Sequence, residues 1–327
     1  MKTESKKSHE SKVETVPDLK LGKKRLDKVT LIFVPLHLGG PHRGVSMGPA
    51  AMKVAEVAEK IERLGFTVRN EVEVNVPNSI CWAEHGSAPK CVPEITEVSL
   101  KVAEAVEEAM SNGSIPITIG GDHSLAIGSI AGVSSYYRKQ KENFGLVWFD
   151  AHGDINTPDT SSSGNVHGMP LAVSLGYGDK RMVDLLGFSP KVQPNRSVLI
   201  GIRDLDPPER EMIDRSGITP YTIRDIDHLG LSKVTDLAVS SLGSDIAGFH
   251  LSFDIDVIDP DVAPGVSTAA PGGLNYRESL QALTLLAESR MLRSIDIVEL
   301  NPANDIRNKT AELATDLILA SLGRRIL

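Results

Sequence analysis

Acidic and imidazole side chains follow directly after several apolar runs of this chain. The run Phe144-Gly-Leu-Val-Trp-Phe149 is followed by Asp150, His152 and Asp154. Residues at positions i, i+2 and i+4 lie on one face of an extended backbone, so we expect these three groups to point the same way. A single pattern of this kind is more often a turn or a helix cap than a functional site. Its meaning therefore depends on whether other segments repeat it.

Two further segments do repeat the pattern. The run His250-Leu-Ser-Phe253 ends in Asp254 and Asp256, and the run at residues 115–119 is closely followed by His123. Three strand ends thus offer four carboxylates and two imidazoles to one crevice. Carboxylates that close together repel one another and raise their own pKa values unless a cation offsets their charge. Two divalent metal ions would supply that offset.

The types of ligand narrow the choice of metal and reaction. Carboxylate oxygens with two imidazoles, and no thiolate nearby, suit Mn²⁺. Two such ions about 4 Å apart can share a hydroxide that forms near neutral pH, because metal ions depress the pKa of water. The residues therefore predict metal-assisted hydrolysis, and they do not identify the substrate.

The elements that must position these residues alternate between strands and helices. Short β-branched apolar runs predict strands at residues 29–35, 115–119, 145–149, 198–202, 248–254 and 294–300. Helical spacing of apolar residues is found at residues 49–64, 94–110, 275–289 and 309–322. The alternation predicts a single doubly wound α/β domain, at residues 27–327, with a parallel sheet flanked by helices on both faces. Ligands of such sheets bind at the carboxyl ends of the strands, where the acidic groups lie.

Composition excludes several classes of protein. The 327 residues carry a formal net charge of −8, which argues against nucleic-acid binding and is compatible with a cationic substrate. No apolar run approaches the ~20 residues of a membrane span. Residues 1–26, rich in Lys, Ser and Glu, are expected to form a flexible tail rather than a secretory leader. Cys81 and Cys91 are interpreted as reduced thiols of a cytoplasmic protein.

The acidic segments resemble the three metal motifs of the ureohydrolase family. These segments are Gly120-Gly-Asp-His-Ser124, Asp150-Ala-His-Gly-Asp154 and Ser252-Phe-Asp-Ile-Asp-Val-Ile-Asp-Pro260. The resemblance begins at Gly44-Val-Ser-Met-Gly-Pro49 and reaches Glu299-Leu-Asn-Pro302, in the family's order. It implies an arginase-like α/β fold and two manganese ions per subunit.

The resemblance also implies a role for each motif residue. It implies that the first ion is bound by His123, Asp150, Asp154 and Asp254, and the second by Asp150, His152, Asp254 and Asp256. Asp154 would also orient the hydroxide that bridges the two ions. Glu299 would receive a guanidinium group through a charge-assisted pair. His167 would transfer a proton to the leaving amine or shuttle protons to bulk water.

The segment after Asp154, which selects the substrate within the family, resembles that of the arginases and not that of the agmatinases. Asn156 and Ser163 match the positions that donate hydrogen bonds to the substrate's α-carboxylate. Asp206 and Glu209 match the positions that accept from the α-ammonium. A helix N-terminal role is also open to Asp206 and Glu209, since Pro207-Pro-Glu209 suits a first helical turn.

The chain departs from the arginase pattern in one region. Val257 stands where arginases usually have glycine, and Gly265-Val-Ser-Thr-Ala269 replaces the common Gly-x-Gly-Thr-Pro. Ser267 is expected to strain a turn that prefers glycine, and Ala269 to loosen the pocket wall. Thr268, a substrate-binding position by the resemblance, is retained.

Taken together, the resemblance implies hydrolysis of L-arginine to L-ornithine and urea, by attack of the bridging hydroxide on the guanidinium carbon. It also implies a homo-oligomer, a trimer or a hexamer. The nearest alternative is an agmatinase or another guanidino-compound hydrolase. A non-catalytic arginine-binding regulator is disfavoured by the full set of carboxylates, and a zinc deacetylase of related fold by the paired metal motifs.

Overall fold

One sheet of eight strands forms the centre of the molecule. The computed structural model describes residues 26–77 and 89–324, so the expected tail at residues 1–26, apart from Leu26, lies outside the described residues. The strands are β1 (Lys28–Val34), β2 (Thr67–Glu73), β3 (Ile115–Gly120), β4 (Asn143–Phe149), β5 (Ser197–Ile202), β6 (Thr219–Thr222), β7 (Ile246–Asp254) and β8 (Leu292–Val298). All six predicted strands are present, and β2 and β6 are additional.

The strands are parallel throughout and run in the order β2-β1-β3-β8-β7-β4-β5-β6. Leu31 pairs with Ile117, and Val147 pairs with Leu251. Every residue of β3 and β5 is buried, as expected for strands covered on both faces. The expectation of a doubly wound α/β fold is confirmed. The order also makes β3, β8, β7 and β4 neighbours. The predicted metal-binding residues lie at the ends of β3, β7 and β4, and Glu299 follows β8.

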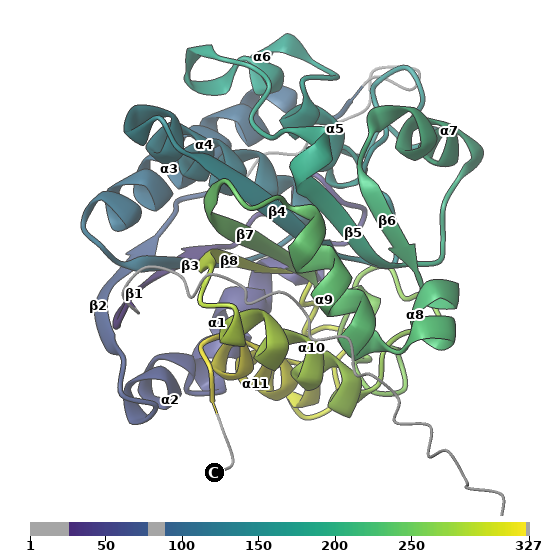
Figure 1. The fold of residues 1–327 in the computed structure, drawn as a ribbon. Coiled ribbons are helices and arrows are strands. Elements are labelled where there is room, and N and C mark those ends of the chain that lie inside the picture. The colour runs from purple at the N-terminus through teal and green to yellow at the C-terminus, as the bar shows by residue number, and fades with distance from the viewer. Residues whose placement is uncertain (1–25, 78–88, 325–327) are drawn as a thin grey trace, which may run out of the picture.

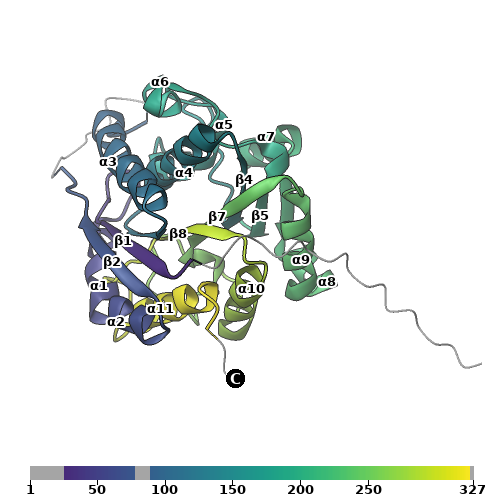
Figure 2. The same cartoon turned by 60° about the vertical axis from the view of Figure 1, so that its left-hand side comes forward.

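Helices cover both faces of the sheet (Figures 1 and 2). They are α1 (Gly48–Val54), α2 (Val57–Arg63), α3 (Val92–Ser111), α4 (Ala126–Gln140), α5 (Pro170–Leu175), α6 (Lys180–Val183), α7 (Pro207–Ser216), α8 (Ile223–Leu229), α9 (Leu231–Ser241), α10 (Tyr276–Glu288) and α11 (Lys309–Ser321). In both views α3 and α4 lie on one face, and α10 and α11 on the other. The core forms two layers of apolar side chains between the sheet and these helices.

The helix predicted at residues 49–64 is two helices in the structure. Glu56 has a φ of 56°, in the left-handed region, and separates α1 from α2. The apolar spacing continues across the break because Met52, Val57 and Ile61 all pack into the same core cluster. The periodicity alone therefore could not reveal the break.

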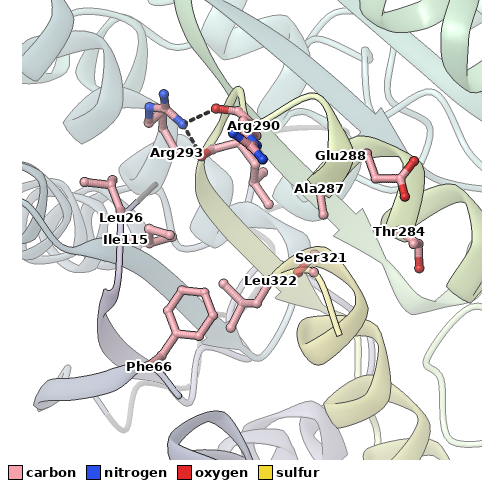
Figure 3. Close-up of a pocket in the computed structure, with 12 residues that line it drawn as sticks. Leu26, Phe66, Ile115, Thr284, Ala287, Glu288, Arg290, Arg293, Ser321 and Leu322 are labelled. Carbon is pink, nitrogen blue, oxygen red and sulfur yellow. Dashed lines mark hydrogen bonds between the residues drawn. The ribbon is translucent and has the colours of Figure 1, made fainter. Parts of the chain in front are cut away.

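A cavity of about 660 Å³ lies at the amino ends of the strands, away from the acidic segments (Figure 3). Ile115 and Leu292, the first residues of β3 and β8, line it together with Leu26. Arg293 lies at its edge and donates hydrogen bonds to the carbonyls of Arg290 and Leu292 (Figure 3). This cavity contains none of the residues for which the sequence predicts chemistry.

Two further expectations concern the membrane and the cysteines. Within residues 26–77 and 89–324, no helix is both long and apolar enough to cross a membrane. Cys91 is disulfide-bonded, so the expectation of two reduced thiols is wrong. Cys81 itself lies outside the described residues.

Gly121 is a close-packing point where β3 meets the acidic segments, and it yields a stability prediction. Its amide donates to the carbonyl of Val34, and its carbonyl accepts from the amide of Glu299. A Cβ at this position would lie 1.7 Å from the carbonyl oxygen of Leu36. Because backbone cannot yield as a flexible side chain can, Gly121→Ala should lower the free energy of unfolding by about 3 kcal/mol, measured by urea denaturation. Gly168→Ala, whose Cβ would meet nothing within 4 Å, is the matched control; equal stability of the two variants would refute this packing.

Candidate metal centre and substrate site

The predicted metal-binding residues converge at the carboxyl ends of three strands, β3, β7 and β4. Asp150 directly follows β4, and Asp254 is the last residue of β7. His123 begins the short 3₁₀ helix η2 (His123–Leu125) that follows β3. All three side chains are buried, with 0 to 2% of each residue exposed. Parallel strands that end at one edge thus bring together groups far apart in the sequence.

The ring nitrogen Nδ1 of His123 faces three carboxylates. It lies 3.3 Å from Asp150 Oδ2, 3.0 Å from Asp154 Oδ2 and 3.1 Å from Asp254 Oδ2. Nevertheless this buried nitrogen has no hydrogen-bond partner. Leaving a buried polar atom unsatisfied costs free energy, and a cation among four such ligand atoms would remove that cost. The arrangement therefore fits a divalent metal ion.

A second group of ligands shares Asp150 with the first. Asp150 Oδ1 lies 3.4 Å from His152 Nδ1, which is 3.1 Å from Asp256 Oδ2. The ligand atoms of Asp150, His152 and Asp256 all lie within 4.8 Å of one another, as do those of His123, Asp150 and Asp254. We call the two positions the His123 position and the His152 position. The carboxylate of Asp150 points one oxygen toward each, which suits a ligand that bridges two ions.

The charges of the cluster conflict when no cation is present. Burial, followed by repulsion from Asp256 and Asp150, raises the pKa of Asp254 well above its ordinary value. Burial and repulsion from Asp150 raise the pKa of Asp154 to about 6. Burial raises the pKa of Asp150, but the neighbouring imidazoles of His123 and His152 outweigh it and lower that pKa. Deprotonation of the whole cluster is thus opposed by its own repulsion, as the sequence predicted.

Local geometry differs from the expectation of an extended segment at residues 150–154. The strand β4 ends at Phe149, and Asp154 has a left-handed φ of 49°. The amide of His152 donates to Asp150 Oδ1 at 2.6 Å, which is the turn chemistry that the alternative interpretation of this motif predicted. The side chains still converge, because the turn folds Asp154 back toward His123.

Two residues that the sequence reasoning did not single out hold the ligands in place. The indole of Trp148 stacks on His123 at 4.2 Å, and its Nε1 donates to Asp150 Oδ2 at 2.9 Å. Ser252 Oγ lies 2.8 Å from His123 Nε2 and fixes the other side of that ring. Such partners orient metal ligands. Trp148 and Ser252 each stand two residues before an aspartate ligand, so they lie on the same face of the strand as that ligand. This spacing is visible in the sequence and could have identified them.

Glu299 and His167 lie next to the metal cluster. Glu299 follows β8, has a left-handed φ of 62° and is 2% exposed. Its Oε1 accepts the amide of His123 at 2.9 Å and lies 3.1 Å from His167 Nδ1. Burial lowers the pKa of His167, but Glu299, Asp154 and Asp122 outweigh it and raise that pKa to about 9. In the metal-free chain, the protonated form of His167 is therefore favoured at neutral pH.

The residues predicted to bind the substrate's α-groups lie along one side of the cluster. Asn156 Nδ2 donates to Asp206 Oδ2 at 3.0 Å. Asp206 and Glu209 form a reciprocal capping box at the start of α7, so the helix N-terminal role is present. Glu209 is 6% exposed, and burial followed by repulsion from Asp154 raises its pKa to about 7. A cation bound here would favour the ionised carboxylate.

The remaining predicted substrate-binding residues, Ser163 and Thr268, are exposed and form few hydrogen bonds within the described residues. Ser163 is exposed, and its Oγ accepts the amide of Asn165 at 3.2 Å. Thr268 is exposed and forms no hydrogen bond within the part of the chain that the structure describes. Ser267 is not among the residues with positive φ, so the expectation that it strains its turn is wrong. Val257 is buried against Gly201.

Comparisons with known proteins give one consistent result. The model of the family described as "Arginase family" matches residues 27–323. An arginase of Bacillus caldovelox is 42% identical over 300 residues, which cover 91% of this chain and 99% of that protein. An arginase of Bacillus subtilis is 40% identical and is covered completely.

Solved structures agree with these sequence matches. The native arginase of Bacillus caldovelox superposes with a TM-score of 0.88 over 92% of this chain and 100% of that chain. Entamoeba histolytica arginase in complex with L-ornithine, 30% identical, superposes with a TM-score of 0.83 over the same shares of both chains. The similarity therefore extends over the whole described sheet and the candidate site.

The pair of His167 and Glu299 predicts a pH-dependent stability in the metal-free protein. Since the folded chain raises the pKa of His167 from about 6.5 to about 9, its protonation stabilises the fold fully below pH 6.5, and this stabilisation is lost as the pH rises through 9. His167→Gln should therefore lower the Tm most at pH 6 and least at pH 10, measured by calorimetry. The exposed His228→Gln is the control. If the Tm difference between wild type and His167→Gln stayed constant from pH 6 to pH 10, the interaction of His167 with Glu299 would be contradicted.

Proposed function

The chain belongs to the arginase family and is a hydrolase that acts on L-arginine, and we propose the role of each site residue in that reaction. The reaction converts L-arginine and water to L-ornithine and urea. The observation that carries the proposal is the buried, unsatisfied Nδ1 of His123 facing three carboxylates. A neutral imidazole nitrogen that converges with three carboxylates in this way can bind a divalent metal ion.

We assign two manganese ions to the site. His123, Asp150, Asp154 and Asp254 would hold one at the His123 position, and Asp150, His152, Asp254 and Asp256 the other at the His152 position. The predominance of carboxylate oxygen among the ligands supports manganese over zinc. When bound, the ions would supply a hydroxide nucleophile near neutral pH, because divalent cations depress the pKa of water.

Three residues around the cluster would handle the guanidinium and the proton. No hydrogen bond within the described residues reaches Glu299 Oε2, so this oxygen is available to pair with the guanidinium. Asp154 would orient the attacking oxygen by accepting its hydrogen bond. A protonated His167 would donate through Nδ1 to Glu299 and keep Nε2 to protonate the leaving amine of ornithine.

The α-groups of arginine would be recognised beside α7. The carboxylates of Asp206 and Glu209 would accept hydrogen bonds from the α-ammonium, whose charge would also ease the repulsion between Glu209 and Asp154. Asn156 and Ser163 would donate to the α-carboxylate. Thr268 is proposed on the resemblance alone, since it forms no hydrogen bond within the described residues.

The wider setting completes the proposal. Residues 27–327 would form the catalytic domain, preceded by a tail at residues 1–26. We also propose a homo-oligomer, a trimer or hexamer, as the family resemblance implies, and a cytoplasmic location.

The test of this function is urea release by metal-free protein reloaded with Mn²⁺ and supplied in parallel with L-arginine and agmatine. Agmatine lacks the α-carboxylate and so probes the roles of Asn156 and Ser163. We expect urea and ornithine from arginine, with kcat/KM for agmatine lower by at least about a hundredfold, the cost of leaving polar groups unpaired. Comparable turnover of agmatine would refute the substrate assignment and leave the metal centre intact.

Asp154→Asn is the matched variant for the same assay. It keeps the shape of the side chain but removes its charge, so urea release should fall by two orders of magnitude or more, as expected when a catalytic acceptor is lost. Asp227→Asn, an exposed change in α8, should leave the rate unaltered. Full activity of Asp154→Asn with normal metal content would show that its role is misassigned.

A further inference from the structure

The guanidinium of Arg203 is saturated with hydrogen bonds to main-chain carbonyls. Arg203 directly follows β5, and its side chain is half-buried. Its five donated bonds are Nε to Pro271 (3.2 Å), Nη1 to Gly201 (3.3 Å) and Val257 (3.1 Å), and Nη2 to Asp256 (2.7 Å) and Ala270 (2.6 Å). A guanidinium has five N–H donors, and all five are used here.

These acceptors belong to segments that carry or flank metal ligands. Nη2 holds the carbonyl of Asp256, a proposed ligand of the His152 position, and Nη1 holds that of the next residue, Val257. A loop runs from Val257 to Ala270. The bonds to the carbonyls of Ala270 and Pro271 hold the far end of this loop. One side chain thus fixes both ends of the loop against β5.

The main chain of Arg203 reaches the other ligand segment. Its amide donates to the carbonyl of Ala151 at 2.8 Å, between Asp150 and His152. The amide of Ala151 in turn donates to Asp256 Oδ1 at 3.2 Å. Arg203 therefore contacts the segments that supply Asp150, His152 and Asp256, which together make the His152 position.

The hydrogen-bond acceptors of Arg203 are carbonyl oxygens, although several carboxylates lie nearby. Asp256, Asp150, Asp259 and Asp254 all interact favourably with the Arg203 cation. Yet within the described residues none of its hydrogen bonds goes to a carboxylate oxygen. The positive charge therefore lies behind the acidic cluster without occupying the oxygens that a metal ion would need.

The surrounding glycines leave room for this arrangement. A Cβ on Gly273 would lie 2.6 Å from Arg203 Nη2 and 2.5 Å from the carbonyl oxygen of Val257. Gly201, one of the five acceptors, has a φ of +95°, which a side chain would strain. The space for the guanidinium thus depends on the absence of side chains at two positions.

We propose that Arg203 is a positioning residue that fixes the turn at residues 254–256 against the segment at residues 150–152 and thereby sets the metal affinity of the His152 position. This inference rests on the proposed metal centre. It assigns Arg203 no contact with substrate or metal. Its effect passes through the main chain to Asp256 and, by way of Ala151, to Asp150 and His152.

The test is Arg203→Lys, which keeps the charge but offers three donors in place of five. The exposed Arg210→Lys is the control, because Arg210 also donates to a main-chain carbonyl, that of Leu205, but away from the cluster. Manganese binding to the metal-free protein is followed by calorimetry, and the coupled manganese pair by electron paramagnetic resonance. Loss of an outer partner of metal ligands typically costs 10–100-fold in metal affinity.

We expect Arg203→Lys to bind the first manganese ion as the wild type does and the second at least about tenfold more weakly. The coupled spectrum should appear only at higher metal concentration, where kcat is restored and KM for arginine is little changed. Unaltered affinity at both positions would overturn the proposal. So would an equal loss at both positions together with a lower Tm, which marks a merely structural role.

Gly273→Ala is a second variant, for use if Arg203→Lys fails to fold. Its Cβ would press both on Nη2 and on the carbonyl oxygen of Val257, so it disturbs the same bonds while keeping the arginine, and the same selective loss of the second ion is expected. Metal content and urea release of the wild type distinguish a failure of this proposal from a failure of the proposed function. Two bound ions and urea release in the wild type, with no selective loss in either variant, would refute the role of Arg203 alone. Fewer than two ions in the wild type would refute the metal centre and this proposal with it.

Discussion

Repulsion among buried carboxylates is the constraint on which this site depends. Asp150, Asp154, Asp254 and Asp256 lie within a few ångströms of two imidazoles, and each is almost wholly excluded from water. Burial and mutual repulsion favour protonation of Asp254 and Asp154, whereas the histidines favour the ionised form of Asp150. No protonation state satisfies every group, and divalent cations would offset the charge directly. A fold that keeps such a cluster must hold it against its own repulsion.

The parallel sheet provides that rigidity. Since β3, β8, β7 and β4 are neighbours, their ends bring His123, Glu299, Asp254 and Asp150 to one edge. Trp148 and Ser252 fix His123 from two sides, and both belong to buried strands. Backbone in the left-handed region at Asp154 and Glu299 places strain at the site, where a rigid surrounding can sustain it.

The fold and the cluster could be predicted from the sequence because their signals are local and repeated. Apolar runs of β-branched residues marked six of the eight strands, and the acidic residues after three of them marked the edge where they meet. The strands β2 and β6 are partly exposed and carry polar residues, so their apolar pattern was weak. The break at Glu56 and the turn at Asp154 depend on single left-handed residues that are not glycine, which periodicity does not detect. The bonds of Arg203 could not be foreseen, because all its acceptors are carbonyls that every residue possesses.

The central claim, that this cluster binds two metal ions, is tested most directly by anomalous diffraction from crystals of the manganese-loaded protein, recorded at the manganese absorption edge. Our account predicts two anomalous peaks per chain, one in contact with His123 and the other with His152, with Asp150 between them. A single peak, or two peaks outside the ends of β3, β4 and β7, would contradict it.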